Sequence, residues 1–455
     1  MKLTPLIALI FFSVSGGAYG IEKLFSTSGP GMGLLLLVAA PLIYGIPHAL
    51  VCAELGTAIP VEGGHYHWVR RGLGNFWGFQ QGVLSWVCSF VDMAVYPVLF
   101  TSYLQSMVAS VAPGKHVLFS IGAIRIDLNW MICLAVIATF TLLNLMGAAW
   151  IGGSSVVFAV ICLTPMLLLT VVGLAHLATG GVSPVAPLTS APDQSAWNAF
   201  GAGLFIAMWN YSGWDAVSTV AGEMENPRAH LPRALAVSVF LITIGYLLPA
   251  IASLSVGADG SAGWRSWESG SFSSVAESLA GPWLQVTVTV GGMFASAAMF
   301  SALLTTNSRL PFALAEDGYF PPWLAKRSAR RQVPVVSVIG SAAIYALFCL
   351  SSFSNLIIVD VFLTNLALLM QVAALLALRV REPDLERPYR IPGGALSLVL
   401  ITTALTGVTA WAAWQQYTEN GTQAVTYCLV AVAGSSLLYF PLARRRKRAA
   451  AVAGI

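Results

Sequence analysis

Ser13-Val-Ser-Gly-Gly-Ala-Tyr-Gly20 interrupts the first long apolar segment of the chain, and Trp209-Asn-Tyr-Ser-Gly-Trp-Asp215 interrupts the sixth. Glycine costs about 1 kcal/mol relative to alanine inside a helix, and the neighbouring small polar residues weaken the helix further. Unwound backbone within a bilayer is tolerated only where it lines a cavity or is buried in protein. Two such breaks at matching places in two halves of a chain are typical of a transporter binding site.

The ends of a broken helix predict the chemistry of its ligand. A half-helix N-terminus offers free N–H groups and a positive dipole end to a carboxylate. The opposite half-helix offers free C=O groups to an ammonium. An amino acid zwitterion carries one group of each kind. The alternative interpretation is that these glycines only permit close packing of helices.

The composition indicates that the surroundings of the chain are lipid. Of 455 residues, 57% are apolar and 9% are charged, against about 25% charged in an ordinary soluble protein. A leading secretory signal peptide is an alternative reading of the first apolar segment. We predict an all-α polytopic membrane protein whose twelve apolar segments are each long enough to span a bilayer. Their approximate bounds are 5–27, 31–59, 75–106, 129–149, 153–178, 197–222, 232–255, 281–314, 334–350, 354–379, 395–416 and 423–442.

The distribution of Lys and Arg predicts the orientation in the membrane. With twelve spans and both termini in the cytoplasm, nearly all of the 23 basic residues fall in cytoplasmic loops, the exceptions being Lys23, Lys115, Arg125 and Arg265. This asymmetry is the positive-inside pattern of a cytoplasmic-membrane protein. The run Arg-Arg-Arg-Lys-Arg at 444–448 fits a cytoplasmic stop, with binding to anionic lipid as a secondary role. Nucleic acid is not expected as a partner.

Ionisable residues inside apolar segments are functional candidates, because burying them in a membrane is expensive. Glu22 and Asp215 each follow a break and are expected to face the site, the alternative being that they cap the resumed helix. Asp92 either faces the site or bonds neighbouring backbone. His48 is either a satisfied interhelical donor or a proton-linked group. Asp360 is expected to be solvated near an outer helix end.

Proton coupling through Asp215, Glu22 or His48 is our hypothesis for the energy source. Ser301, Thr305 and Thr306 are candidate cation ligands, because hard cations bind such oxygens; the alternative is that they bond their own helix backbone. No cofactor or metal is expected. The cysteines are scattered without CxxC spacing, and the histidine pair at 65–67 has the wrong spacing for one helical face.

Four stretches in this order resemble the amino acid–polyamine–organocation permeases over nearly the whole chain. They are SVSGGAYGIE (13–22), WNYSGWDAVSTVAGEMENPRAHLPRAL (209–235), SRLPFALAEDGYFP (308–321) and ERPYRIPGG (386–394). The plant polyamine uptake branch, next to the L-type amino acid transporters, is the most similar. Its similar stretches here are AELGTAIPVEGGHYHW (53–68), GFQQG (78–82) and YPVLF (96–100).

The resemblance implies a LeuT-type fold, a five-plus-five inverted repeat with broken helices 1 and 6. The first repeat would cover 1–178, the second 197–379, two peripheral helices 395–442, and a basic cytoplasmic tail 443–455. The substrate would bind between helices 1, 3, 6, 8 and 10.

The resemblance also implies roles for residues at the breaks. Gly16 and Gly17 would meet a carboxylate, carbonyls from Trp209 to Ser212 would meet an amine, and Trp209 would cover the site. The residues that we expect to bind substrate are Ser13, Ser15, Gly16, Gly17, Gly20, Glu22, Asp92, Trp209, Asn210, Tyr211, Ser212 and Gly213.

The chain departs from the polyamine branch at charged positions. Ser13, His48 and Ser301 stand where that branch tends to have carboxylates, and Lys23 replaces an acidic residue. Fewer negative charges weaken the attraction for a polycation. The local charges therefore favour a zwitterionic or less cationic amino compound, and a polyamine is the alternative.

The function that we predict is secondary active transport of a small amino compound, by symport, uniport or exchange. A membrane enzyme would need a catalytic constellation, which the sequence does not display. A non-transporting receptor on the same fold and a channel are the remaining alternatives. No P-loop is present, which argues against an ATP-driven pump, and no domain for an obligate protein partner is evident.

Overall fold

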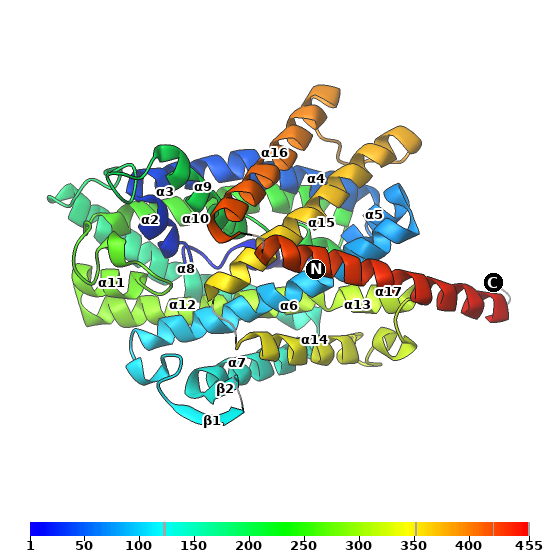
Figure 1. Cartoon of the computed structure of the whole chain (residues 1–455), viewed down its shortest axis with the longest axis horizontal. Helices are drawn as coiled ribbons and strands as arrows, with labels where there is room; N and C mark the ends of the chain where they lie inside the picture. Colours follow the sequence, from blue (N-terminus) through cyan, green and yellow to red (C-terminus); the bar gives the residue numbers. More distant parts are fainter. Residues whose placement is uncertain (122–123, 351–352, 422, 454–455) are drawn as a thin grey trace.

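The computed structural model describes residues 1–121, 124–350, 353–421 and 423–453. These residues form a bundle that is almost entirely helical (Figure 1). The last residues of the predicted basic tail, 454–455, lie outside the described residues.

The first predicted break is present in the structure. Helix α1 (Leu3–Val14) stops at the glycine stretch, and α2 (Glu22–Ser28) starts after it. Gly17 and Gly20 have φ values of 91° and 97°, which other residues rarely adopt. The glycines thus supply both the low helix propensity and the backbone conformation that the break needs.

The second break is shorter than predicted. Helix α9 (Ala196–Asn210) includes Trp209 and Asn210, and the chain resumes as the 3-10 helix η3 (Ala216–Glu223). The Asn210 side-chain Nδ2 donates to the Ile206 carbonyl at 2.9 Å, one turn back along α9. The unwound segment is therefore 211–215, with Gly213 at φ 90°.

The two breaks touch each other. A Cβ added at Gly213 would lie 2.4 Å from the Ser13 carbonyl oxygen. Only glycine permits this approach, so the sequence composition that unwinds the second helix also lets the two unwound segments meet.

The long helices pack around these breaks. Helix α6 (Asn75–Gln105) contacts both α12 (Pro282–Asn307) and α15 (Phe353–Arg381), and α8 (Ala148–Ala178) contacts α10 (Pro227–Leu254). In Figure 1, helix α16 (Gly394–Asn420) crosses the upper part of the bundle, and α17 (Gln423–Ala453) crosses in front of it and projects beyond it at the C-terminal end. The helix α17 continues through the basic run predicted as a tail.

Shorter elements complete the bundle. They are α3 (Pro30–Ala40), the π-helix η1 (Pro41–Gly45), α4 (Ile46–Ala58), α5 (His65–Leu73), η2 (Ala109–Val111), α7 (Leu128–Asn144), η4 (Trp264–Ser266), α11 (Phe272–Ala280), α13 (Arg309–Glu316), η5 (Pro322–Ala325) and α14 (Val335–Phe348). The strands β1 (Val117–Ile121) and β2 (Ile124–Asp127) form an antiparallel hairpin in which Ser120 pairs with Arg125.

Among the described residues, seven helices are long and apolar enough to cross a membrane. They are Pro30–Ala58, Asn75–Gln105, Val157–Ala178, Pro227–Leu254, Pro282–Glu316, Asp360–Arg381 and Gly394–Gln415. Helices α1, α7 and α14 are apolar but shorter. The prediction of a polytopic α-helical protein holds, and the twelve crossings and the inverted repeat stay predictions.

A buried carboxylate connects three distant parts of the chain. Glu54 on α4 is fully buried and accepts hydrogen bonds from Arg379 Nε at 2.8 Å and from the Ile391 amide at 2.8 Å. Arg387 Nε lies 3.5 Å from Glu54 Oε1. The stretch 386–394 is therefore held against α4 by one fully paired charge.

Replacing Glu54 with glutamine should lower the stability of the protein strongly. Breaking a buried ion pair by removing one partner costs about 3–5 kcal/mol, because the other charge is left buried. The measurement is thermal unfolding of detergent-purified protein. Glu386→Gln is the matched control. The Glu386 side chain is 70% exposed and its partner Arg228 is 48% exposed, so this ion pair contributes at most about 1 kcal/mol. Equal melting temperatures for the two variants would contradict this role of Glu54.

Candidate functional site

A cavity lies between the two breaks. Its volume is about 70 Å³, which gives room for a few water molecules. The lining residues come from both breaks, α5, α6, α10, α12 and α15. They are Ser13, Val14, Gly16, Tyr19, His65, Ser85, Cys88, Ser89, Asp92, Tyr96, Trp209, Asn210, Ser212, Gly213, Asp215, Ala216, Tyr246, Met299, Leu303, Asn307, Asp360, Thr364 and Ala367.

Several residues expected to bind substrate line this cavity and others do not. Those present are Ser13, Gly16, Asp92, Trp209, Asn210, Ser212 and Gly213, together with the proton candidate Asp215. Ser15, Gly17, Gly20, Glu22, Tyr211 and His48 do not line it. Tyr211 is fully buried and donates to the Leu37 carbonyl at 3.0 Å.

The cavity is acidic. Asp92, Asp215 and Asp360 all line it, and none of its described lining residues is Lys or Arg. The positive charge of Lys23 argues against a cationic ligand only if Lys23 lies at the site. Lys23 lies outside this lining and pairs with Glu268 at 3.2 Å.

Asp360 corrects an expectation. We expected a solvated side chain near a helix end, but Asp360 lies inside α15 and only 2% of it is exposed. Cys88 Sγ on α6 lies 2.9 Å from Asp360 Oδ1 and 3.1 Å from the Thr364 hydroxyl. These polar neighbours on the α6–α15 contact explain how a carboxylate is accommodated there. Asp360, like Asp92, is an ionisable residue within an apolar segment of the sequence. That pattern was sufficient to make Asp360 a candidate site residue.

Asp92 sits beside an aromatic pair. Tyr96 donates to Asp92 Oδ1 at 2.9 Å, and the Tyr96 ring stacks on Trp209 with centroids 6.4 Å apart. Trp209 also covers Gly20, whose added Cβ would lie 3.5 Å from the indole. The aromatic pair therefore connects the cavity to both broken helices.

Asp215 is surrounded by groups from three other elements. Gln371 Nε2 on α15 donates to its Oδ2 at 2.5 Å. His48 Nε2 on α4 lies 3.8 Å from Oδ1, and His65 Nδ1 on α5 lies 3.7 Å from Oδ2. We did not predict His65 or Gln371, since the histidine pair at 65–67 was weighed only as a metal site. A contact with η3 holds His65 near Asp215, because the His65 backbone amide donates to the Ser218 hydroxyl at 3.3 Å.

Glu22 bonds the Gly20 amide of the first break, and not the amides of Gly16 and Gly17 that we expect to meet a ligand carboxylate. Its Oε2 accepts from the Gly20 amide at 2.8 Å, and its Oε1 accepts from the Gly270 amide at 3.1 Å and from the Tyr103 hydroxyl. The Gly17 amide donates to Ser15 Oγ at 3.0 Å. Glu22 therefore bonds groups outside α2 and makes no side-chain cap hydrogen bond at the start of that helix.

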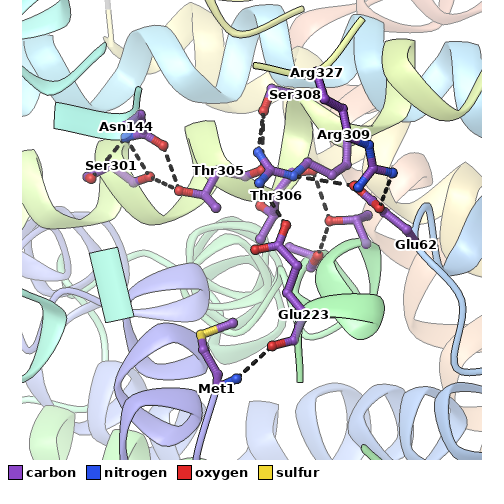
Figure 2. A network of polar contacts seen from close by, with 12 residues as sticks. Met1, Glu62, Asn144, Glu223, Ser301, Thr305, Thr306, Ser308, Arg309 and Arg327 are labelled. Carbon is purple, nitrogen blue, oxygen red and sulfur yellow. Dashed lines mark hydrogen bonds and ion pairs between the residues drawn. The ribbon is translucent and has the colours of Figure 1, made fainter. Parts of the chain in front are cut away.

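The candidate cation ligands face another helix. Asn144 of α7 donates to the Ser301 hydroxyl at 3.1 Å and accepts from the Thr305 hydroxyl at 2.6 Å (Figure 2). The Thr306 hydroxyl donates to the Leu303 carbonyl at 3.1 Å. None of the three lines the cavity, and α12 presents Met299 to Gly16 of the first break.

An ion-pair network lies outside the cavity lining. Arg309, 2% exposed, donates to Glu223 Oε1 at 2.8 Å and lies 3.7 Å from Glu62. Arg327 pairs with the same Glu62 at 2.7 Å (Figure 2). The network joins η3 to the loop before α5 and to α13. Among the described residues, no group of three His, Cys, Asp or Glu side chains is arranged to hold a metal ion.

Comparisons with known proteins place these features in a family. The model of the amino acid permease family matches residues 6–434. The polyamine transporter PUT1 of Oryza sativa subsp. japonica is 34% identical over 90% of this chain and 73% of its own length. The polyamine transporter RMV1 of Arabidopsis thaliana is 31% identical over 90% and 79%. The human cystine/glutamate transporter is 26% identical over 85% and 75%.

The fold has a counterpart among solved structures. The crystal structure of MhsT in complex with L-phenylalanine superposes with a TM-score of 0.63, at 14% identity, over 91% of this chain and 98% of that one. The prediction of this transporter fold is confirmed at the level of overall architecture. The chain belongs to the amino acid permease family and is a multi-pass membrane transporter, not an enzyme.

Proposed function

We propose that this transporter carries cationic organic amines of the diamine and polyamine class, and that twelve crossings in a five-plus-five inverted repeat hold the site. The observation that carries this proposal is the cavity lining, with Asp92, Asp215 and Asp360 and no described Lys or Arg. Buried carboxylates in a site of low dielectric attract positive charge strongly. An extended amine with charges at both ends can satisfy more than one of them.

The first break supports a ligand without a carboxylate. The amides of Gly17 and Gly20 already have partners in Ser15 and Glu22. A ligand carboxylate would compete with Ser15 for the Gly17 amide and would approach three buried aspartates. Both effects disfavour an amino acid relative to a diamine. This revises the preference for a zwitterion drawn from the sequence, because Asp360 joins the site and Lys23 does not line it.

An amino acid is the second candidate substrate. Gly16 lines the cavity at the first break, and the solved structure with this fold holds L-phenylalanine. The orientation that we propose places both termini in the cytoplasm and the protein in the cytoplasmic membrane, in keeping with the positive-inside pattern. Protons are the proposed coupling ion.

Asp360→Asn should reduce putrescine uptake into liposomes by on the order of 30-fold, because a buried charge that pairs with the ligand is worth about 2 kcal/mol or more. Initial uptake rates at several concentrations measure the loss. Asp259→Asn is the matched control, since Asp259 is 89% exposed in its pair with Arg265 and should transport normally. Unaltered putrescine uptake by Asp360→Asn, or uptake of neutral amino acids but not of putrescine by the wild type, would refute the cationic-amine proposal.

Gly16→Leu should abolish uptake while leaving membrane insertion intact. A Cβ at Gly16 would already lie 2.8 Å from Met299 Sδ, so a leucine side chain would fill the cavity at the first break. Gly407→Leu on α16 serves as the control, because a Cβ there meets no atom within 4 Å among the described residues. Uptake and surface expression are measured for both. A transporting Gly16→Leu variant would remove the first break from the site.

A further inference from the structure

Two buried histidines next to Asp215 have ring nitrogens that could bind protons and that substrate binding does not require. All four ring nitrogens of His48 and His65 are buried without a hydrogen-bond partner among the residues that the structure describes. Unpaired buried polar atoms are costly, so such a group calls for an explanation. Both imidazoles flank the same carboxylate at 3.7–3.8 Å.

The surroundings of Asp215 leave its charge only partly balanced. Gln371 donates one neutral hydrogen bond. Tyr44 on η1 and Cys52 on α4 also interact electrostatically with Asp215, but both side chains are uncharged when protonated. The nearest cation that the protein can supply is therefore an imidazolium made by protonating His48 or His65. With the substrate absent, one proton at this cluster neutralises Asp215 through a charge-assisted hydrogen bond.

We infer that the His48–Asp215–His65 cluster is a proton site that competes with the substrate ammonium for Asp215, so that amine binding expels one proton and transport is proton–amine exchange. This inference rests on the proposed function, because it requires a cationic amine in the cavity. It also names His65 as a coupling residue.

The charge balance sets the direction of exchange. An ammonium that reaches Asp215 brings one positive charge next to an imidazolium, and two like charges in a site of low dielectric repel. The imidazolium releases its proton to water, and the ammonium takes its place beside the carboxylate. Burial lowers the pKa of His65, with the Asp215 charge acting in the opposite direction, so losing that charge partner to the substrate favours release. Symport would need the two cations to bind together.

Purified full-length protein and labelled putrescine test this competition. Binding in weakly buffered detergent solution should release about one proton per amine bound. The apparent Kd should rise about tenfold for each unit decrease in pH over the range in which the site is protonated, as linkage requires. In liposomes, an acidic lumen should accelerate putrescine uptake and an acidic exterior should slow it.

The histidine variants identify the proton site. His48→Gln/His65→Gln, or either single variant if the pair does not fold, should lose proton release and the pH dependence of Kd. His176→Gln is the control, since His176 bonds Ser255 at 3.2 Å outside the cavity lining, and it should retain both. Putrescine transport with proton uptake, or with an affinity independent of pH, would overturn exchange and leave the proposed function standing. No putrescine binding at any pH would overturn both.

Discussion

Hydrocarbon offers no hydrogen bonds, so every unwound peptide group in this transporter must find a partner inside the protein. The two breaks meet this constraint with their own side chains and near neighbours. Ser15 and Glu22 serve the first break, and Tyr246 donates to the Asn210 carbonyl at 2.8 Å at the second. The Trp214 indole Nε1 donates a hydrogen bond to the Tyr211 carbonyl at 2.7 Å. Backbone that is already satisfied has less capacity for a ligand, which shifts recognition toward the aspartates.

An acidic cavity whose described lining holds no Lys or Arg has a consequence for the empty transporter. Three carboxylates that share a small buried volume repel each other, and each is costly to desolvate. The protein reduces this cost with Tyr96 at Asp92, Cys88 at Asp360 and Gln371 at Asp215. None of these is a cation. The cavity thus favours the uptake of positive charge from outside, whether as substrate or as protons.

The sequence predicted those parts of the structure that local composition determines. Glycine content located both breaks, because low helix propensity and positive φ are properties of single residues. The start of the second break was wrong by two residues, since Trp209 and Asn210 stay helical. Asp360 carries the same sequence signal as Asp92, an ionisable residue in an apolar segment, and its contact with Cys88 shows that it faces α6. His65 required tertiary information, because the bond between its amide and Ser218 holds it near Asp215. Ser301 and Thr305 had suitable oxygens, but only the packing of α7 shows that Asn144 occupies them.

Trp209, near the end of α9, contacts two other elements that form the site. Its indole stacks on Tyr96 of α6 at an interplanar angle of 24° and lies against Gly20 of the first break. Any rearrangement of either broken helix changes the polarity and quenching around this ring. In a background where the other tryptophans among the 14 in the chain are replaced, the emission of Trp209 becomes an intrinsic optical reporter of cavity occupancy, readable during turnover without a labelled substrate.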